Sequence, residues 1–144
     1  MQAQIMPFTE TEIAYLDEQR LGRLATLRPD GTLQNSPVGF RYNRDAGTID
    51  IGGFNFAASR KYRNVAANGQ VAFVVDDVPS LDPWQVRCLE IRGTAEALAQ
   101  PADSAYGTGD PIIRIHPRRI ISYGVEQQGA EPHRIVTNNR TVSA

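Results

Sequence analysis

Hydrophobic and polar residues alternate along most of the chain, and this alternation predicts β-strands. The first three predicted strands cover about residues 20–27, 33–42 and 48–53. The turns "PDG" and "RDAG" separate them, so we predict an antiparallel meander. Pro37 lies inside the second strand, which predicts an edge strand or a bulge there.

Three further strands follow the meander. The segment "QVAFVVDD", residues 70–77, is apolar on both faces and predicts a buried fourth strand. Residues 86–98 alternate cleanly as a fifth, and residues 111–125 give a last strand that we expect to be interrupted at Pro117. The stretches "VPSLDPW" and "AQPADSAYGTGD" are predicted as loops.

Two segments have helical spacing instead. In "FTETEIAYLDEQ", Thr9 and Glu12 are placed for a capping box, and Phe8 for a hydrophobic staple. In "AASRKYRNVAANG" the apolar residues recur at helical intervals, and Asn68-Gly69 is a plausible stop. Short antiparallel strands with one crossing helix predict a mainly β protein with short helices (α+β), a small β-barrel plugged by helices.

Length and composition indicate one globular domain over residues 1–144, with 41% hydrophobic and 22% charged residues. The polar tail at 127–144 is expected to be loosely ordered or docked on a partner. A net charge of −1 gives no reason to expect a nucleic-acid partner. The cluster Arg60, Lys61 and Arg63 therefore needs a local explanation, either a solvated helix face or a bound anion.

Cellular location is also suggested by the sequence. Cys88 is the single cysteine, so an internal disulfide is excluded and a reducing cytoplasm fits. The first residues lack a basic segment followed by an apolar one, so we expect no signal peptide. No apolar run approaches the roughly 20 residues that span a bilayer, and a membrane location is not expected.

The chain offers few reactive side chains of its own. Its histidines are His116, before a proline and interpreted as structural, and His133, in the polar tail. No Cys or His pair has metal-ligand spacing, and no serine lies in a nucleophile elbow. Cys88 is interpreted as a small core residue, and Asp76-Asp77 is interpreted as the end of a strand that leads into a loop. We therefore predict no catalytic residue and no metal site: the chain catalyses nothing or borrows its chemistry from a cofactor.

Four blocks in order carry a family resemblance: "GRLATLRPDGTLQNSPVGFRY", "SRKYRNVAANGQVAFVVDD", "PWQVRCLEIRGTAEAL" and "IHPRRIISYG". Over residues 8 to 126 the chain resembles the pyridoxamine-phosphate-oxidase-like flavin and deazaflavin proteins. It is most similar to their actinobacterial F-420-dependent oxidoreductases. The resemblance implies a split β-barrel and a homodimer with cofactor sites at the subunit interface. It also implies coenzyme F-420 as cofactor, with FMN as the alternative.

The resemblance also implies cofactor-binding residues. Ser59, Arg60 and Lys61 match the segment that holds the cofactor phosphate, and hydroxyl and cationic groups at a helix start suit an anion. Arg63 and Asn64 would extend that contact, although Arg63 also fits a solvated helix face. Trp84 and Arg87 match residues near the cofactor ring or its ribityl chain, and both also fit dimer packing. The strand beside the ring is matched by Gln34, Asn35, Ser36, Pro37 and Val38, where Pro37 would leave polar groups free for the ligand.

The chain also departs from the family pattern. Cys88 stands where the family often has glycine, and Tyr123 where it has tryptophan. The tail "PHRIVTNNRTVSA" lacks the terminal arginine and histidine motif of true pyridoxamine phosphate oxidases, so vitamin B6 oxidation is not expected.

Three functions stay open at this point. The first is a reductase that uses reduced F-420 to deliver hydride to an unsaturated small molecule. The second is an FMN-binding oxidoreductase of the same fold. The third is a non-catalytic carrier or sensor of a flavin, tetrapyrrole or lipid.

Overall fold

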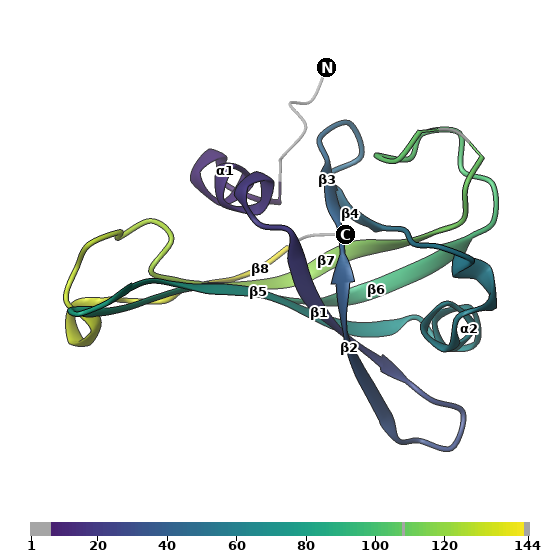
Figure 1. Ribbon diagram of the computed structural model, residues 1–144, viewed down its shortest axis with the longest axis horizontal. Coiled ribbons are helices and arrows are strands. Elements are labelled where there is room, and N and C mark those ends of the chain that lie inside the picture. The colour runs from purple at the N-terminus through teal and green to yellow at the C-terminus, as the bar shows by residue number, and fades with distance from the viewer. Residues whose placement is uncertain (1–6, 108, 143–144) are drawn as a thin grey trace.

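The computed structural model describes residues 7–107 and 109–142 (Figure 1). The two ends of the predicted domain, residues 1–6 and 143–144, lie outside the described residues. The helices are α1 (Glu10–Glu18) and α2 (Arg60–Ala67), with short 3-10 turns at Phe56–Ala58 and Pro132–Arg134. The strands are β1 (Leu21–Leu27), β2 (Leu33–Gly39), β3 (Arg41–Asn43), β4 (Thr48–Ile51), β5 (Gln70–Leu81), β6 (Trp84–Leu98), β7 (Ile112–Tyr123) and β8 (Asn138–Thr141).

The strands form one antiparallel sheet that curls on itself. Its order is β2-β1-β5-β6-β7-β4-β3, with β8 added to β7. The two end strands, β2 and β3, follow one another in the chain and are separated only by Phe40. The chain therefore brings the two ends of the sheet together without pairing them, which is the split β-barrel that the sequence predicted. Pro37 lies in the end strand β2, where its missing N–H is tolerated, as predicted.

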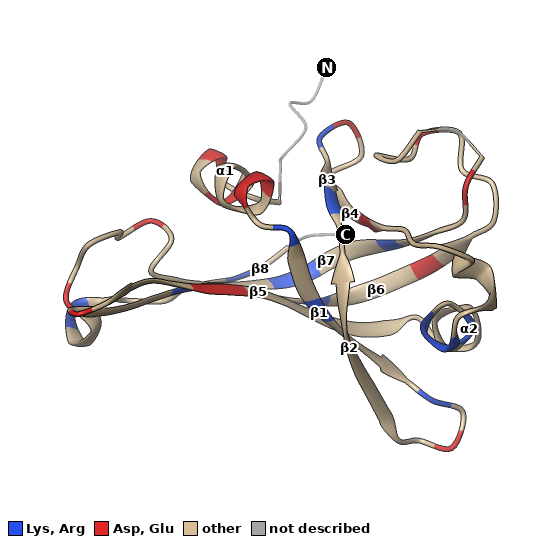
Figure 2. Ribbon diagram, in the orientation of Figure 1, with Lys and Arg blue, Asp and Glu red and all other residues tan. Residues whose placement is uncertain are grey.

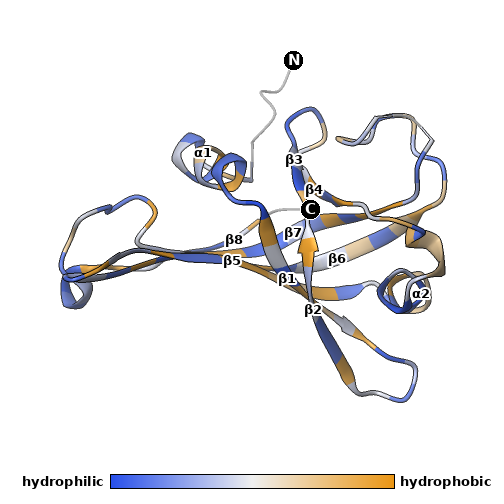
Figure 3. Ribbon diagram, viewed as in Figure 1, coloured by the Kyte–Doolittle hydropathy of each residue, from blue (hydrophilic) through white to orange (hydrophobic). Residues whose placement is uncertain are grey.

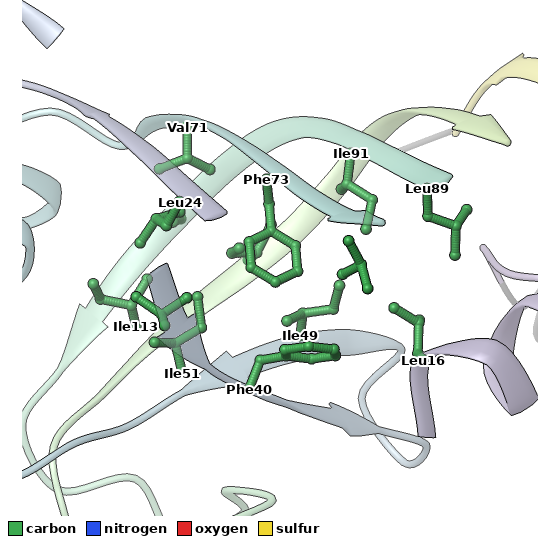
Figure 4. Close-up of a cluster of buried hydrophobic side chains, with 14 of the residues drawn as sticks. Leu16, Leu24, Phe40, Ile49, Ile51, Val71, Phe73, Leu89, Ile91 and Ile113 are labelled. Carbon is green, nitrogen blue, oxygen red and sulfur yellow. The ribbon is translucent and has the colours of Figure 1, made fainter. Parts of the chain in front are cut away.

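The core fills the concave side of the curled sheet. Side chains from β1, β4, β5, β6 and β7 converge there with Leu16 of α1 (Figure 4). Phe40, at the joint between β2 and β3, packs edge-to-face on Phe73 with ring centroids 5.3 Å apart. Hydrophobic and hydrophilic residues alternate along the strands (Figure 3), as the sequence pattern required.

The predicted start of α1 is confirmed. The Thr9 side chain accepts a hydrogen bond from the Glu12 amide, and the Glu12 carboxylate accepts one from the Thr9 amide. Phe8 and Ile13 are both buried in the core, as a hydrophobic staple requires.

Two predicted boundaries were wrong. The second strand does not run through residue 42 but ends at Gly39, since the corner at Phe40 divides it into β2 and β3. The predicted loop at 78–84 is largely strand, because Ser80 and Leu81 pair with Gln85 and Trp84 in a long hairpin. Each half of that hairpin supplies the other's hydrogen-bond partners, which a local pattern does not reveal.

The last strand is continuous through Pro117. A register shift between Arg92 and Gly93 of β6 leaves Arg118 of β7 as an extra residue beside the proline. This bulge accommodates the missing N–H of Pro117 without ending the strand. A Cβ on Gly93 would lie 2.2 Å from the His116 carbonyl oxygen, so the close approach at the bulge requires glycine.

Part of the C-terminal tail is docked on its own chain, which the sequence did not predict. Strand β8 pairs with β7 through Arg119–Ser122. From β8, the Arg140 guanidinium reaches the fully buried carboxylate of Glu12 and the Pro7 carbonyl oxygen. The tail therefore joins the sheet and neutralises the buried carboxylate at the start of α1.

Candidate functional site

The N-terminal end of α2 carries the basic cluster Arg60, Lys61 and Arg63, on the helix coloured blue in Figure 2. Ser59 caps the helix by accepting from the Tyr62 amide, and its hydroxyl donates to the Phe56 carbonyl oxygen at 2.6 Å. Within the described residues, no carboxylate pairs with the three cations. Unpaired cations and helix N-terminal amides form a surface suited to an anion.

An aromatic cavity of about 470 Å³ adjoins this basic cluster. The two features meet at Phe56, whose ring centroid lies 5.9 Å from Lys61 Nζ and 5.7 Å from the Tyr62 ring. Just before Phe56, Asn55 adopts a left-handed backbone conformation (φ 49°), which asparagine tolerates well. The preceding residue, Phe54, is fully exposed. The lining consists of Gly52, Gly53, Phe54, Asn55, Phe56, Ala57, Tyr106, Asp110 and Pro111.

The predicted residues of β2 point to opposite sides of the sheet. Gln34 and Ser36 are opposite the buried Thr26 and Leu24 and share their inner face with Val38. Asn35 and Pro37 lie on the outer face and are exposed. A single ligand on one face can therefore meet only part of this predicted set through side chains.

Asn64 connects α2 to the sheet. Its side chain is buried, with a residue exposure of 1%, and Nδ2 donates to Thr26 Oγ1 at 3.1 Å and to Gln34 Oε1 at 3.2 Å. Its Oδ1 has no hydrogen-bond partner within residues 7–107 and 109–142, and the same is true of Ser36 Oγ. The structure thus joins Gln34 to Asn64, places Ser36 on the same face of β2 as Gln34, and leaves one oxygen atom each of Ser36 and Asn64 buried and unsatisfied.

Trp84 and Arg87 lie elsewhere, on the hairpin of β5 and β6. This hairpin extends away from α2 to the other end of the molecule in Figure 1. Trp84 is 54% exposed. Arg87 is held in a bidentate ion pair with Asp77, at 3.0 and 2.6 Å, and its guanidinium lies 4.8 Å above the Tyr15 ring. One chain therefore does not bring Trp84 and Arg87 to the basic cluster.

A buried ionic network holds the loop before β7 and was missed by the sequence prediction. Asp50 of β4 is fully buried and lies opposite Arg114 of β7, whose Nε and Nη2 donate to it at 3.1 and 3.3 Å. Arg114 Nη1 also binds Asp103 Oδ1 at 3.0 Å. The other donors to Asp50 are Asn43 Nδ2, Thr48 Oγ1 and the Ala105 amide.

The pKa of Asp50 reflects this network. Burial alone would raise the pKa of the carboxyl group, but hydrogen bonds from Arg114, Ala105 and Asn43 and the Arg114 charge outweigh burial. The pKa therefore lies below its usual value. The sequence did contain a signal, since "TIDI" and "IIRI" each place one charge among the apolar residues of a predicted strand.

Within residues 7–107 and 109–142, the remaining cysteine and histidine side chains lie apart from one another. Cys88 is half-buried, and burial together with Asp76 and Glu90 raises the pKa of its thiol. His116 Nε2 lies 2.7 Å from Glu96 Oε2. Among the described residues we find no group of three or more His, Cys, Asp or Glu side chains placed to hold a metal ion. The helices of that part of the chain are too short to cross a membrane.

Comparison with known proteins identifies relatives of this chain. The 5a,11a-dehydrotetracycline/5a,11a-dehydrooxytetracycline reductase of Streptomyces rimosus is 51% identical over 122 residues, which are 84% of this chain and 86% of that protein. A solved structure described as an F420 reductase is 28% identical, with a TM-score of 0.54, over 72% of this chain and 90% of that one.

A conserved hypothetical protein of Mycobacterium tuberculosis shares the fold. It has a TM-score of 0.65 and 21% identity over 100% of this chain and 98% of its own. Residues 8–137 match the pyridoxamine 5'-phosphate oxidase family. The four sequence blocks, the split barrel and these matches agree, and the chain belongs to the pyridoxamine 5'-phosphate oxidase family.

Proposed function

We propose that the protein is an oxidoreductase that uses the deazaflavin coenzyme F-420 to reduce a carbon–carbon double bond in a conjugated, polycyclic small molecule. The observation that carries the proposal is the 51% identity, over most of both chains, to a reductase of dehydrotetracyclines. The 28% identity to an F420 reductase supports the choice of cofactor.

The described residues fit a large anionic cofactor with a flat ring. Arg60, Lys61 and Arg63 would hold its phosphate and the carboxylates of its tail, since the three cations have no acidic partners of their own in the described part of the chain. The adjoining aromatic cavity is walled by Phe54, Phe56 and Tyr106 and suits a planar ring. Among the predicted contacts, Ser36 and Asn64 each have one buried oxygen atom without a hydrogen-bond partner in the described part of the chain.

The chain's own part in the reaction is binding and positioning. When bound in its reduced form, the cofactor supplies a hydride for one carbon of the double bond, and solvent supplies the proton for the other. Phe54, Phe56 and Tyr106 would hold the cofactor ring in place against the substrate, and this positioning lowers the barrier without a protein acid or base.

Cofactor titration tests the proposal. We expect F-420 to bind more tightly than FMN, because the tail of F-420 offers the basic cluster more negative charge than one phosphate. The measurement is an equilibrium titration of the purified protein with each cofactor, followed by oxidation of bound, reduced F-420 on addition of 5a,11a-dehydrotetracycline. Tighter binding of FMN would favour the flavin alternative, and no reaction with either cofactor would favour a carrier or sensor.

We further propose that the protein is a homodimer in which the hairpin of one subunit approaches the cofactor site of the other. In one chain, the β5–β6 hairpin that carries Trp84 and Arg87 extends away from α2 and its basic cluster (Figure 1). The hairpin also exposes apolar side chains at Val78, Leu81 and Trp84, which a partner would cover.

Sedimentation equilibrium tests the assembly. At micromolar concentration we expect the mass of two chains, and the single-residue change Trp84→Asp is expected to shift the protein toward one chain, because it places a charge in an apolar contact. A parent protein with the mass of one chain would contradict the dimer. A dimer that Trp84→Asp leaves intact would place the interface away from the hairpin.

A further inference from the structure

A second cavity of about 470 Å³ lies where the two ends of the sheet meet. It is formed by the end of α1, the corner between β2 and β3, and the loop before β7. Its lining consists of Leu16, Asp17, Gln19, Arg20, Gly39, Phe40, Arg41, Tyr42 and Tyr106. Tyr106 lines the aromatic cavity as well, so its side chain is the wall that the two cavities share.

Tyr106 is held firmly in that position. The Ala105 amide donates to Asp50 Oδ2 at 2.9 Å, and Arg114 Nη2 donates to the Asp103 carbonyl oxygen at 3.2 Å. The Tyr106 ring packs on Gly52, where an added Cβ would lie 3.5 Å from ring atoms. The Arg41 guanidinium lies 4.8 Å from the ring centroid on the second-cavity side of the lining. The buried network of Asp50 and Arg114 therefore positions Tyr106 between the cavities.

The second cavity combines an aromatic wall with excess positive charge. Arg20 and Arg41 line it against one carboxylate, Asp17, and neither arginine forms an ion pair within the described residues. Within the described residues, the only side-chain hydrogen bond of Arg41 is a long one, 3.5 Å, from its Nη1 to the Ala105 carbonyl oxygen. Its remaining N–H groups are available, and a planar guanidinium is suited to two adjacent oxygen atoms of an anion.

We propose that this second cavity binds the substrate, and that it selects a flat conjugated ring system whose edge carries an ionised enol or phenol. Arg41 pairs with the anionic oxygens, and Tyr106 supports the Arg41 guanidinium and forms an aromatic wall beside the ring system. The inference rests on the proposed function, because it assigns the aromatic cavity to the cofactor and the second cavity to the substrate.

Equilibrium binding of tetracycline tests the inference, since tetracycline is flat, fluorescent and bears an ionised enol. The titration is made with protein saturated with F-420 and with EDTA present, because tetracycline also binds divalent cations. Arg41→Gln is expected to weaken tetracycline binding about tenfold or more, as loss of a charge-assisted contact does. The affinity for F-420, titrated separately, should stay within about twofold of the parent value.

Two further variants make the test specific. Arg44→Gln removes the same charge from the turn between β3 and β4, outside the second cavity, and is expected to bind tetracycline like the parent. Tyr106→Phe keeps the ring and should bind normally, whereas Tyr106→Ala should weaken binding several-fold, with a melting curve to confirm folding.

Three outcomes would overturn the inference. They are equal effects of Arg41→Gln and Arg44→Gln, unchanged binding in both Arg41→Gln and Tyr106→Ala, and no binding of tetracycline by the parent. Failure of the proposed function is distinguishable, because it would appear as failure of the parent to bind F-420.

Discussion

Replacing Asp50 by asparagine is expected to lower the free energy of unfolding by about 3–5 kcal/mol, because it leaves the Arg114 charge buried without its main partner. Asp50 is fully buried, and its carboxylate accepts hydrogen bonds from three side chains and one amide. An asparagine can accept at only one of its two terminal atoms, so the network cannot be rebuilt. Urea denaturation of the parent and the variant measures the difference.

An exposed ion pair provides the matched control. Asp76 binds Arg23 at 2.6 Å, but both side chains are more than 40% exposed. Asp76→Asn makes the same chemical change and should destabilise by less than about 1 kcal/mol. If the two variants unfold at the same urea concentration, the buried network contributes no more than a surface pair.

The same network predicts how stability depends on pH. The folded-state pKa of Asp50 lies below its usual value, so the unfolded chain binds a proton more readily than the folded one. The stabilisation is therefore present above about pH 4, the ordinary pKa of an aspartic acid, and is lost as the pH falls further. Asp50→Asn should lose this contribution, so its stability should decrease less steeply in acid than that of the parent.

Elements whose signals are local were predicted well. The capping box of Thr9 and Glu12 lies within four consecutive residues, and it is present. Pro37 indicated an edge strand because proline lacks the N–H that an inner strand needs, and β2 is at the end of the sheet.

Elements that depend on distant partners were predicted poorly. Residues Ser80 and Leu81 are strand only because Gln85 and Trp84 pair with them across the turn. Strand β8 is polar and short. It forms because β7 has an edge with which it can pair and because Arg140 of β8 binds the buried carboxylate of Glu12. Neither partner could be identified from the pattern of β8 itself.

The candidate site shows the same division. The basic cluster was found from adjacent residues, whereas the cavity walls were not. Tyr106 lies in a segment that was predicted only as a loop, and its position depends on Asp50 and Arg114, which are 64 residues apart in sequence. Asn64 was predicted to extend the cofactor surface, which stays a prediction; the sequence did not indicate that its side chain also links α2 to the sheet through Thr26 and Gln34.

Lys61→Ala is expected to weaken F-420 binding by about ten- to a hundredfold, the loss that follows from removing a charge-assisted contact of about 1.5–3 kcal/mol. Lys61 lies at the junction of the basic cluster and the aromatic cavity, and its ammonium group has no carboxylate partner in the described residues. Without cofactor, the variant should unfold almost like the parent, because in the described part of the chain the Lys61 ammonium forms no ion pair and lies 5.9 Å from the Phe56 ring centroid.

The salt dependence and two controls separate a specific contact from general charge. The difference between Lys61→Ala and the parent should shrink at high salt, where screening already weakens the contact in the parent. Arg118→Ala removes one exposed cation from β7 and should bind F-420 like the parent, whereas Lys61→Arg should retain most of the affinity because the charge remains. Equal dissociation constants for the parent and Lys61→Ala at low salt would mean that the cations of α2 are simply a solvated helix face. In that case the anion-binding site would have to be sought among the arginines of the second cavity.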